Sequence, residues 1–252
     1  MKPKSEELDN LAATLDKAIK ETRNILGPDR IELISESEGS IGAMVAWPLL
    51  FRCLNLGESA MQAAKVRNGE TVALTARSLA ELCYLVGYMG PEFERVNKYI
   101  VGSTRDVRNK LKKVSEGAAD PVIRKAASKM REMTADVPIS LCEGWESQIA
   151  KRAEAANMGQ DYLVRYTLLC EEAHHSERVL AHYMRKCSDG IEIRTRAEDR
   201  QIWLWLCLAT FYWGHCVRPL LKYLRIAKAS LIKKTLGPLE PWLELKEEKF
   251  VS

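Results

Sequence analysis

The chain has 252 residues, of which 46% are apolar and 29% are charged, and its formal net charge is +4. This composition is ordinary for a globular protein and supplies a sizeable core, while the mild net charge does not by itself indicate nucleic-acid binding. The seven cysteines are scattered without a C-x-x-C motif, which argues against a disulfide framework and favours a reduced, cytoplasmic setting. The first ten residues lack the apolar core of a signal peptide.

Helical periodicity runs along the chain and predicts an all-α fold, a bundle of about seven helices without a sheet. Residues 5–26 are expected to form an amphipathic helix, with Ser5 as its cap and Gly27-Pro28 as its stop. We expect one helical domain over residues 1–252, with a polar C-terminal tail at 236–252. The other predicted helices cover residues 41–66, 70–89, 91–116, 121–134, 146–157, 161–186 and 195–234, the last of these bending or restarting at Pro219.

One apolar stretch, Ile202 to Gly214, runs for 13 residues without a charge. A membrane-spanning helix needs about 18 to 20 apolar residues, so this stretch is too short to cross a bilayer. The sequence therefore predicts a buried core helix and no membrane association.

The helix at 70–89 combines a stripe of large apolar residues, a stripe of small residues that permits close helix packing, and a polar stripe. On the polar stripe, Arg77 and Glu81 form an i, i+4 pair, and Tyr84 and Tyr88 follow one and two turns later. Two interpretations stay open: an ion pair on a solvated face, or an arginine oriented by a glutamate in an internal polar pocket. The small-residue stripe and the Trp-rich helix are also candidates for a homodimer interface.

Three of the four histidines, His174, His175 and His182, lie within nine residues of the helix at 161–186. His174 is on the shoulder of an apolar face, where it is either a hydrogen-bonded core residue or part of a functional site. A metal site built from Glu171, His175 and His182 is a weaker alternative, because a second E-x-x-H helix is missing and residues seven apart lie about 10 Å apart. The sequence predicts neither a resident metal nor a cofactor.

Recognised catalytic and nucleotide-binding patterns are missing: there is no G-x-G-x-x-G, P-loop, G-x-S-x-G or H-E-x-x-H. The arginine-to-histidine spacing of HEPN-type ribonucleases is missing as well. Two basic clusters at helix ends are candidates for phosphate contacts, although the sequence favours solvated helix faces, where charges near a helix C-terminus complement its dipole. The first contains Arg105, Arg108, Lys110, Lys112 and Lys113, and the second contains Lys222, Arg225, Lys228, Lys233 and Lys234.

Two segments resemble the domain of unknown function 5677 family of bacterial and phage proteins. They are ALTARSLAELCYLVGYM, at residues 73–89, and the segment from Trp145 to YLVRYTLLCEEAHHS, which ends at residue 176. The family pattern is R-S-x-x-E before an aromatic residue, then a Trp, and then a Tyr-rich helix that ends in Ser- or Cys-x-x-x-His. Its positions here are Arg77, Glu81, Tyr84, Trp145, Tyr162, Tyr166, Cys170 and His174. The resemblance implies an all-helical fold in which these residues cluster, and it implies no established activity.

Two functions follow as hypotheses. The first is a binding or regulatory module, with a role in bacterial stress or phage defence by family context, whose pocket recognises a small polar or anionic ligand. The second is a metal-independent nuclease or phosphotransfer enzyme, in which His174 is the general acid/base and Arg77, oriented by Glu81, stabilises the phosphorane. Both require Arg77, Glu81 and His174 to converge in space, with Tyr84, Tyr88, Trp145, Tyr166 and Cys170 as binding residues.

Overall fold

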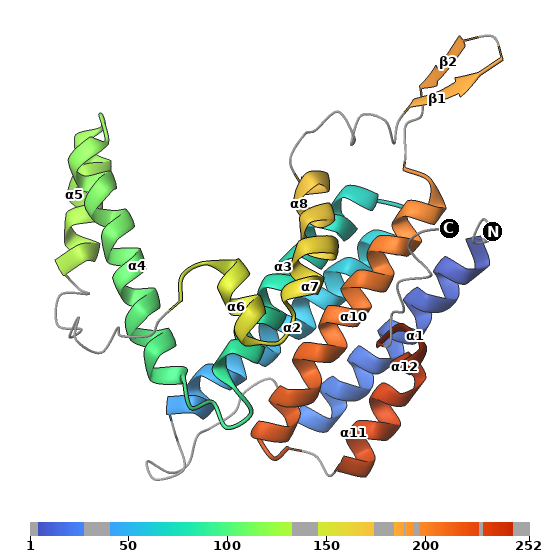
Figure 1. Ribbon diagram of the computed structural model, residues 1–252, viewed down its shortest axis with the longest axis horizontal. Helices are drawn as coiled ribbons and strands as arrows, with labels where there is room; N and C mark the ends of the chain where they lie inside the picture. Colours follow the sequence, from blue (N-terminus) through green and yellow to red (C-terminus); the bar gives the residue numbers. More distant parts are fainter. Residues whose placement is uncertain are drawn as a thin grey trace.

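Four long helices form the centre of the fold and bury their apolar stripes against one another (Figure 1). They are α1 (Ser5–Leu26), α2 (Ile41–Lys65), α3 (Gly69–Met89) and α10 (Asp199–Tyr223). The most extensive contact is between α3 and α10, and α2 packs against both. The computed structural model describes residues 5–27, 41–132, 146–173, 184–188, 190–193, 197–226 and 229–243.

Helix α3 is central because its sequence gives it two apolar faces. Its large residues, among them Leu79 and Met89, are fully buried, and so are Ala76 and Ala80 of the small stripe. At the end of that stripe, a Cβ added to Gly87 would lie 2.6 Å from the Cβ of Ala156. The prediction that small residues admit a close neighbour is therefore confirmed.

Helix α10 contains the apolar stretch 202–214, which lies in the core as predicted. A capping box formed by Glu198 and Gln201 begins the helix, and Pro219 stays inside it. The chain then restarts in α11 (Ala229–Leu236). Among the described helices, none is both long and apolar enough to cross a membrane.

The chain after α11 differs from the predicted polar tail. Residues 237–243 form a 3-10 turn, η3 (Gly237–Leu239), and a short helix, α12 (Glu240–Leu243). Leu239 and Leu243 are buried against the bundle, and a Cβ added to Gly214 of α10 would collide with Leu243. The leucines reach the core because they recur at four-residue spacing, a signal that the polar composition of the segment concealed.

A pair of helices extends away from the bundle, as Figure 1 shows at its left. It consists of α4 (Val96–Gly117) and α5 (Pro121–Glu132), and we refer to residues 96–132 as the basic arm. At its base Phe93 adopts a left-handed φ of 54° and stacks on Tyr223 of α10, with ring centroids 4.2 Å apart. A bulky residue adopts this backbone conformation only where packing holds it there, and here the stack on Tyr223 supplies that packing.

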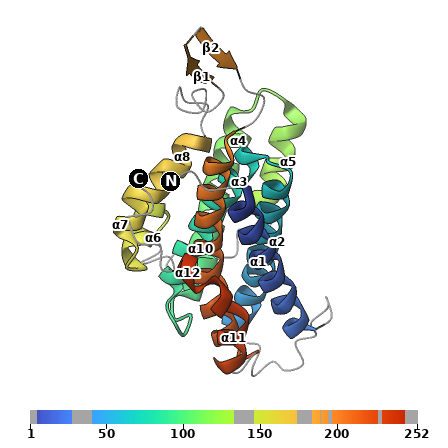
Figure 2. The ribbon, with the colours of Figure 1, turned by 90° about the vertical axis from the view of Figure 1, so that its right-hand side faces the viewer.

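The segment before α10 covers α3 and then leaves the bundle. Helices α6 (Ile149–Ala155) and α7 (Gly159–Asp161), the π-helical turn η2 (Tyr162–Tyr166) and α8 (Thr167–Ala173) lie along α3, as both views show (Figures 1 and 2).

Two short strands, β1 (Met184–Cys187) and β2 (Gly190–Ile193), then form an antiparallel hairpin. The prediction of a helix through Lys186 is wrong at residues 184–186, because Gly190 has a φ of 145° that favours a hairpin turn and β-branched residues follow it. The all-α class is confirmed, with this hairpin as the exception within the described ranges.

The contact between α2 and α10 gives a test of core packing. A Cβ at Gly57 would lie 2.5 Å from Cδ1 of the fully buried Trp213, whereas a Cβ at Gly117 of α4 would meet nothing within 4 Å. We expect Gly57→Ala to lower the free energy of unfolding by about 1–3 kcal/mol, and Gly117→Ala to raise it by up to about 1 kcal/mol. Urea denaturation measures both, and equal effects would contradict this packing.

Candidate functional site

Asp161, at the end of α7, is the centre of a polar network inside the fold. Its Oδ2 accepts hydrogen bonds from the hydroxyls of Tyr84 in α3 and Tyr212 in α10, both at 2.7 Å. Its Oδ1 accepts a hydrogen bond from Nη1 of Arg165 at 2.7 Å. The Asp161 side chain is 9% exposed and that of Arg165 is 15% exposed. A buried carboxylate needs such partners, and here they come from three different elements.

The tyrosines of this network stay protonated over the physiological range. Burial raises the pKa of Tyr84, and the negative charge of Asp161 raises it further. The same two causes raise the pKa of Tyr212 well above its ordinary value. Both hydroxyls therefore remain hydrogen-bond donors to Asp161, and neither serves as a base near neutral pH.

The π-helical turn aligns two further tyrosines beside this network. Tyr162 and Tyr166 stack with ring centroids 5.1 Å apart and an interplanar angle of 20°. Both rings meet the ring of Tyr84 edge-on, at 6.2 and 5.8 Å. Single π-turns within α-helices are frequent at functional sites, and this one lies between Asp161 and the next polar cluster.

That cluster consists of Arg77, Glu81 and Tyr166. The Nε atom of Arg77 lies 3.3 Å from Oε1 of Glu81, and the hydroxyl of Tyr166 donates to the same oxygen at 2.8 Å. Hydrogen bonding with Tyr166 raises the pKa of Arg77, with smaller contributions from nearby groups that include Cys170 and Glu81. Burial and the hydrogen bond to Glu81 raise the pKa of Tyr166. The Arg77 and Glu81 side chains are 28% and 39% exposed, so the cluster is half-buried.

The structure brings together most of the described residues that sequence reasoning selected. Arg77, Glu81, Tyr84, Tyr166 and Cys170 lie at one contact between α3 and the segment η2–α8. Tyr88 is buried at the far end of α3, where the Arg95 guanidinium covers its ring at 5.3 Å. The remaining predicted residues, Trp145, His174, His175 and His182, lie outside the described part of the chain, so the convergence with His174 and the weaker metal site with Glu171 stay predictions.

Sequence reasoning missed Asp161, Arg165 and Tyr212. The i, i+4 spacing of Asp161 and Arg165 was visible as a possible ion pair, but nothing local marked that pair as buried. Tyr212 lies in an apolar helix that is read as core, and its partner is 51 positions earlier in the chain. Such long-range hydrogen bonds leave no periodic signal in one sequence.

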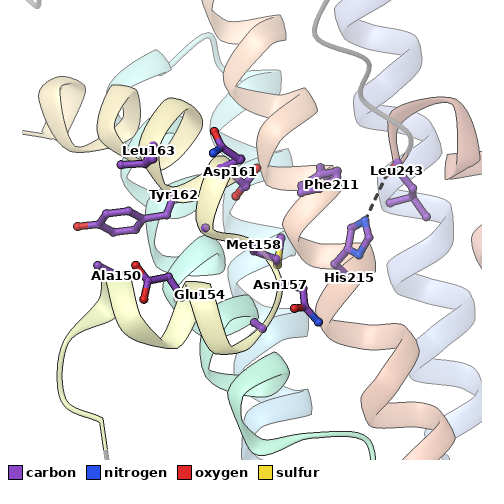
Figure 3. A pocket seen from close by; sticks show the side chains of 13 residues that line it. Ala150, Glu154, Asn157, Met158, Asp161, Tyr162, Leu163, Phe211, His215 and Leu243 are labelled. Carbon is purple, nitrogen blue, oxygen red and sulfur yellow. Dashed lines mark hydrogen bonds between the residues drawn. The ribbon is translucent and has the colours of Figure 1, made fainter.

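An open cleft of about 1090 Å³ lies beside Asp161, between the segment α6–η2 on one side and α10 with α12 on the other (Figure 3). Its wall contains two aromatic rings, those of Tyr162 and Phe211, and it also contains polar groups of three kinds. These lining groups are the carboxylates of Glu154 and Asp161, the amides of Asn157 and Gln160, and the imidazole of His215.

His215 connects the cleft to the C-terminal helix. Its Nε2–H donates to the carbonyl oxygen of Leu243 in α12 at 3.3 Å, which leaves Nδ1 as the acceptor of the neutral ring. The ring lies 4.4 Å from that of Phe211. Although His215 is exposed at the surface, desolvation of its ring lowers its pKa, and the positive charges of Arg218 and Arg165 lower it further. The hydrogen bond to Leu243 opposes this shift without reversing it.

Comparison with known proteins adds a family and no activity. A model described as a family of unknown function (DUF5677) matches residues 43–192, which include α3, the basic arm and the segment α6–α8. Neither a curated protein nor a solved structure matches the chain.

Removal of the central carboxylate tests the network. We expect Asp161→Asn to lower the free energy of unfolding by about 3 kcal/mol, because the neutral amide removes the negative charge that faces the partly buried Arg165 and replaces one of the two acceptor oxygens by an NH2 donor. Glu154→Gln, at an exposed carboxylate of the same cleft, is the control and should change the free energy by less than about 0.5 kcal/mol. Equal effects in urea denaturation would contradict the central role of Asp161.

The environment of His215 predicts a pH dependence of stability. Its pKa is lower in the folded than in the unfolded protein, so below the ordinary histidine pKa of about 6.5 the unfolded state binds more protons. Its contribution to stability is therefore complete above that pH and is lost as the pH falls through the folded-state value. His215→Asn should reduce the loss of stability between pH 8 and pH 5, which is measured from the urea midpoints at each pH. If the pH profile of the variant equals that of the original protein, the assignment of this pH dependence to His215 is wrong.

Proposed function

We propose that this chain, which belongs to the family of unknown function DUF5677, is a helical binding module that holds a small polar ligand in the cleft beside Asp161. The observation that carries the proposal is the cleft itself. Its volume of about 1090 Å³ suffices for a small organic molecule, and its wall combines an apolar majority with a few placed polar groups.

The charges of the cleft favour a neutral or cationic ligand over an anionic one. The lining residues include Glu154 and Asp161 but no lysine or arginine. The negative charge of Asp161 is partly compensated by the positive charge of Arg165. Glu154 is therefore the carboxylate that is exposed to a ligand. Tyr162, which is partly exposed, offers a ring for an aromatic or cationic group, whereas the buried Phe211 ring already lies under the Arg165 guanidinium at 4.9 Å.

The contacts among the polar side chains near the cleft support binding rather than catalysis. The side chains that would act chemically already hold one another: Arg77 faces Glu81, and Asp161 accepts three hydrogen bonds. The three hydrogen bonds to Asp161 hold that part of the network rigid, which favours selective binding because little freedom is lost when the ligand enters. The Nε atom of Arg77, by contrast, is buried without a hydrogen-bond partner and is held by its charge interaction with Glu81.

A regulatory role follows from the position of α12. Leu243 lines the cleft and accepts the hydrogen bond of His215, so a ligand that fills the cleft also contacts the C-terminal helix. Ligand occupancy would then fix α12 on the bundle. A role in bacterial stress or phage defence and a cytoplasmic location stay predictions from the family resemblance and the composition, and so does the nuclease alternative with His174 and Arg77.

Two small molecules that share the same phenol ring and carry opposite charges test the proposal. Tyramine carries an ammonium group where 4-hydroxyphenylacetate carries a carboxylate. By isothermal titration calorimetry we expect tyramine to bind with a Kd on the order of 1 mM, since a ligand of this size gains about 0.3–0.5 kcal/mol per heavy atom. The carboxylate should bind at least about tenfold more weakly, because it meets Glu154.

Two neighbouring substitutions locate the binding site. Leu163 lines the cleft and Val164 does not, and the two residues are 62% and 52% exposed. Leu163→Trp should obstruct the cleft and abolish tyramine binding, whereas Val164→Trp should leave its Kd within about twofold. Tighter binding of the carboxylate, or equal effects of both substitutions, would overturn the proposal.

A further inference from the structure

We propose that the basic arm, residues 96–132, binds the phosphate backbone of nucleic acid. The arm contains ten lysines and arginines against four aspartates and glutamates, a net charge of +6. Since the whole chain has a net charge of +4, the remaining residues together carry −2. The positive charge is therefore segregated on one protruding element, a pattern that whole-chain composition conceals.

The charge of the arm does not serve its folding. In α4 only Val96, Val101 and Gly102 are buried, and in α5 only Ala127 is. Like charges stand one helical turn apart, as at Arg108 and Lys112, where they repel each other by a few tenths of a kcal/mol. Two ion pairs of the arm, Arg105 with Asp106 and Lys112 with Glu116, are 3.9 Å apart at the surface, and exposed pairs of this kind contribute little to stability.

The arm has the shape that a contact with a duplex requires. Helix α4 has 22 residues, so it is about 33 Å long, which is close to one helical turn of B-form DNA. Lys98, Arg105, Arg108 and Lys112 recur at spacings of seven, three and four residues, which places them on one face of α4. Lys98 and Lys112 are exposed and the two arginines are half-exposed. The buried Val101 shares the first turns of this face near the base of the arm, where Phe93 stacks on Tyr223.

Charge and composition favour nucleic acid over the other occupants of such a surface. A second copy of the arm would bring +6 against +6, which opposes self-association through it. Helices that lie in a membrane interface use Trp, Phe and Leu on their apolar side. The arm contains no Trp or Phe, and its most exposed apolar residues are aliphatic, such as Val122 and Ile123.

The test uses the full-length protein and fluorescein-labelled DNA and RNA duplexes of one sequence, about 20 base pairs long, in fluorescence anisotropy from 50 to 200 mM salt. We expect binding whose log Kd rises linearly with log salt. The triple variant Lys98→Gln, Arg108→Gln, Lys112→Gln should raise the Kd at least about tenfold. It should also lower the salt slope by about 0.9 for each phosphate that its side chains no longer neutralise. A lower Kd for either the DNA or the RNA duplex identifies the type of duplex that the protein prefers.

The second basic cluster supplies the matched control. The triple variant Lys222→Gln, Lys233→Gln, Lys234→Gln removes the same charge from the bundle and should leave the Kd within about twofold. Equal losses of affinity in both triple variants would overturn the assignment of binding to the arm.

Binding to phosphatidylserine vesicles without binding to either duplex would show that the arm contacts a membrane instead of nucleic acid. Circular dichroism should show both variants folded, since the substituted side chains are solvent-accessible. The outcome is independent of tyramine binding in the cleft.

Discussion

One buried carboxylate constrains the interior of this fold. Asp161 is 9% exposed, and a charge in that position is tolerated only when donors surround it. Those donors come from α3, from η2 and from α10, so the carboxylate fixes three elements relative to one another. The wall of the cleft on either side of Asp161 depends on that alignment. A change in the register of η2 would move Arg165 and Tyr162 together, and it would break the network and the cleft in one step.

The π-turn explains why the tyrosines occupy this position. In it, a backbone hydrogen bond spans five residues instead of four, which shifts the side chains that follow. Tyr162 and Tyr166 then stack on one side of α3, where both rings meet Tyr84 edge-on. The hydroxyl of Tyr166 reaches Glu81, whereas that of Tyr84 reaches Asp161. The stack thus joins the half-buried pair at Arg77 to the buried carboxylate, and the two clusters behave as one polar layer.

The fold was predictable where the signal is local, and the site was predictable in part. The helix at 5–26 was expected at the observed bounds, and the stripe that carries Arg77, Glu81 and Tyr84 identified one wall of the polar layer. The hairpin at 184–193 was not foreseen, because the helical pattern before it extends into its first strand. Asp161 and Tyr212 were missed for another reason: their importance lies in a hydrogen bond between distant positions, which no local pattern encodes.

The two proposed sites have opposite charge, and this difference separates their ligands. The lining of the cleft carries carboxylates, whereas the arm carries +6, so an anion directed to the arm is not attracted to the cleft. Physiological salt screens exposed charges over a distance of about 8 Å. The two sites nevertheless share one helix, because Phe93 at the base of the arm stacks on Tyr223, the last residue of α10, and α10 also supplies Tyr212 to the network and His215 to the cleft.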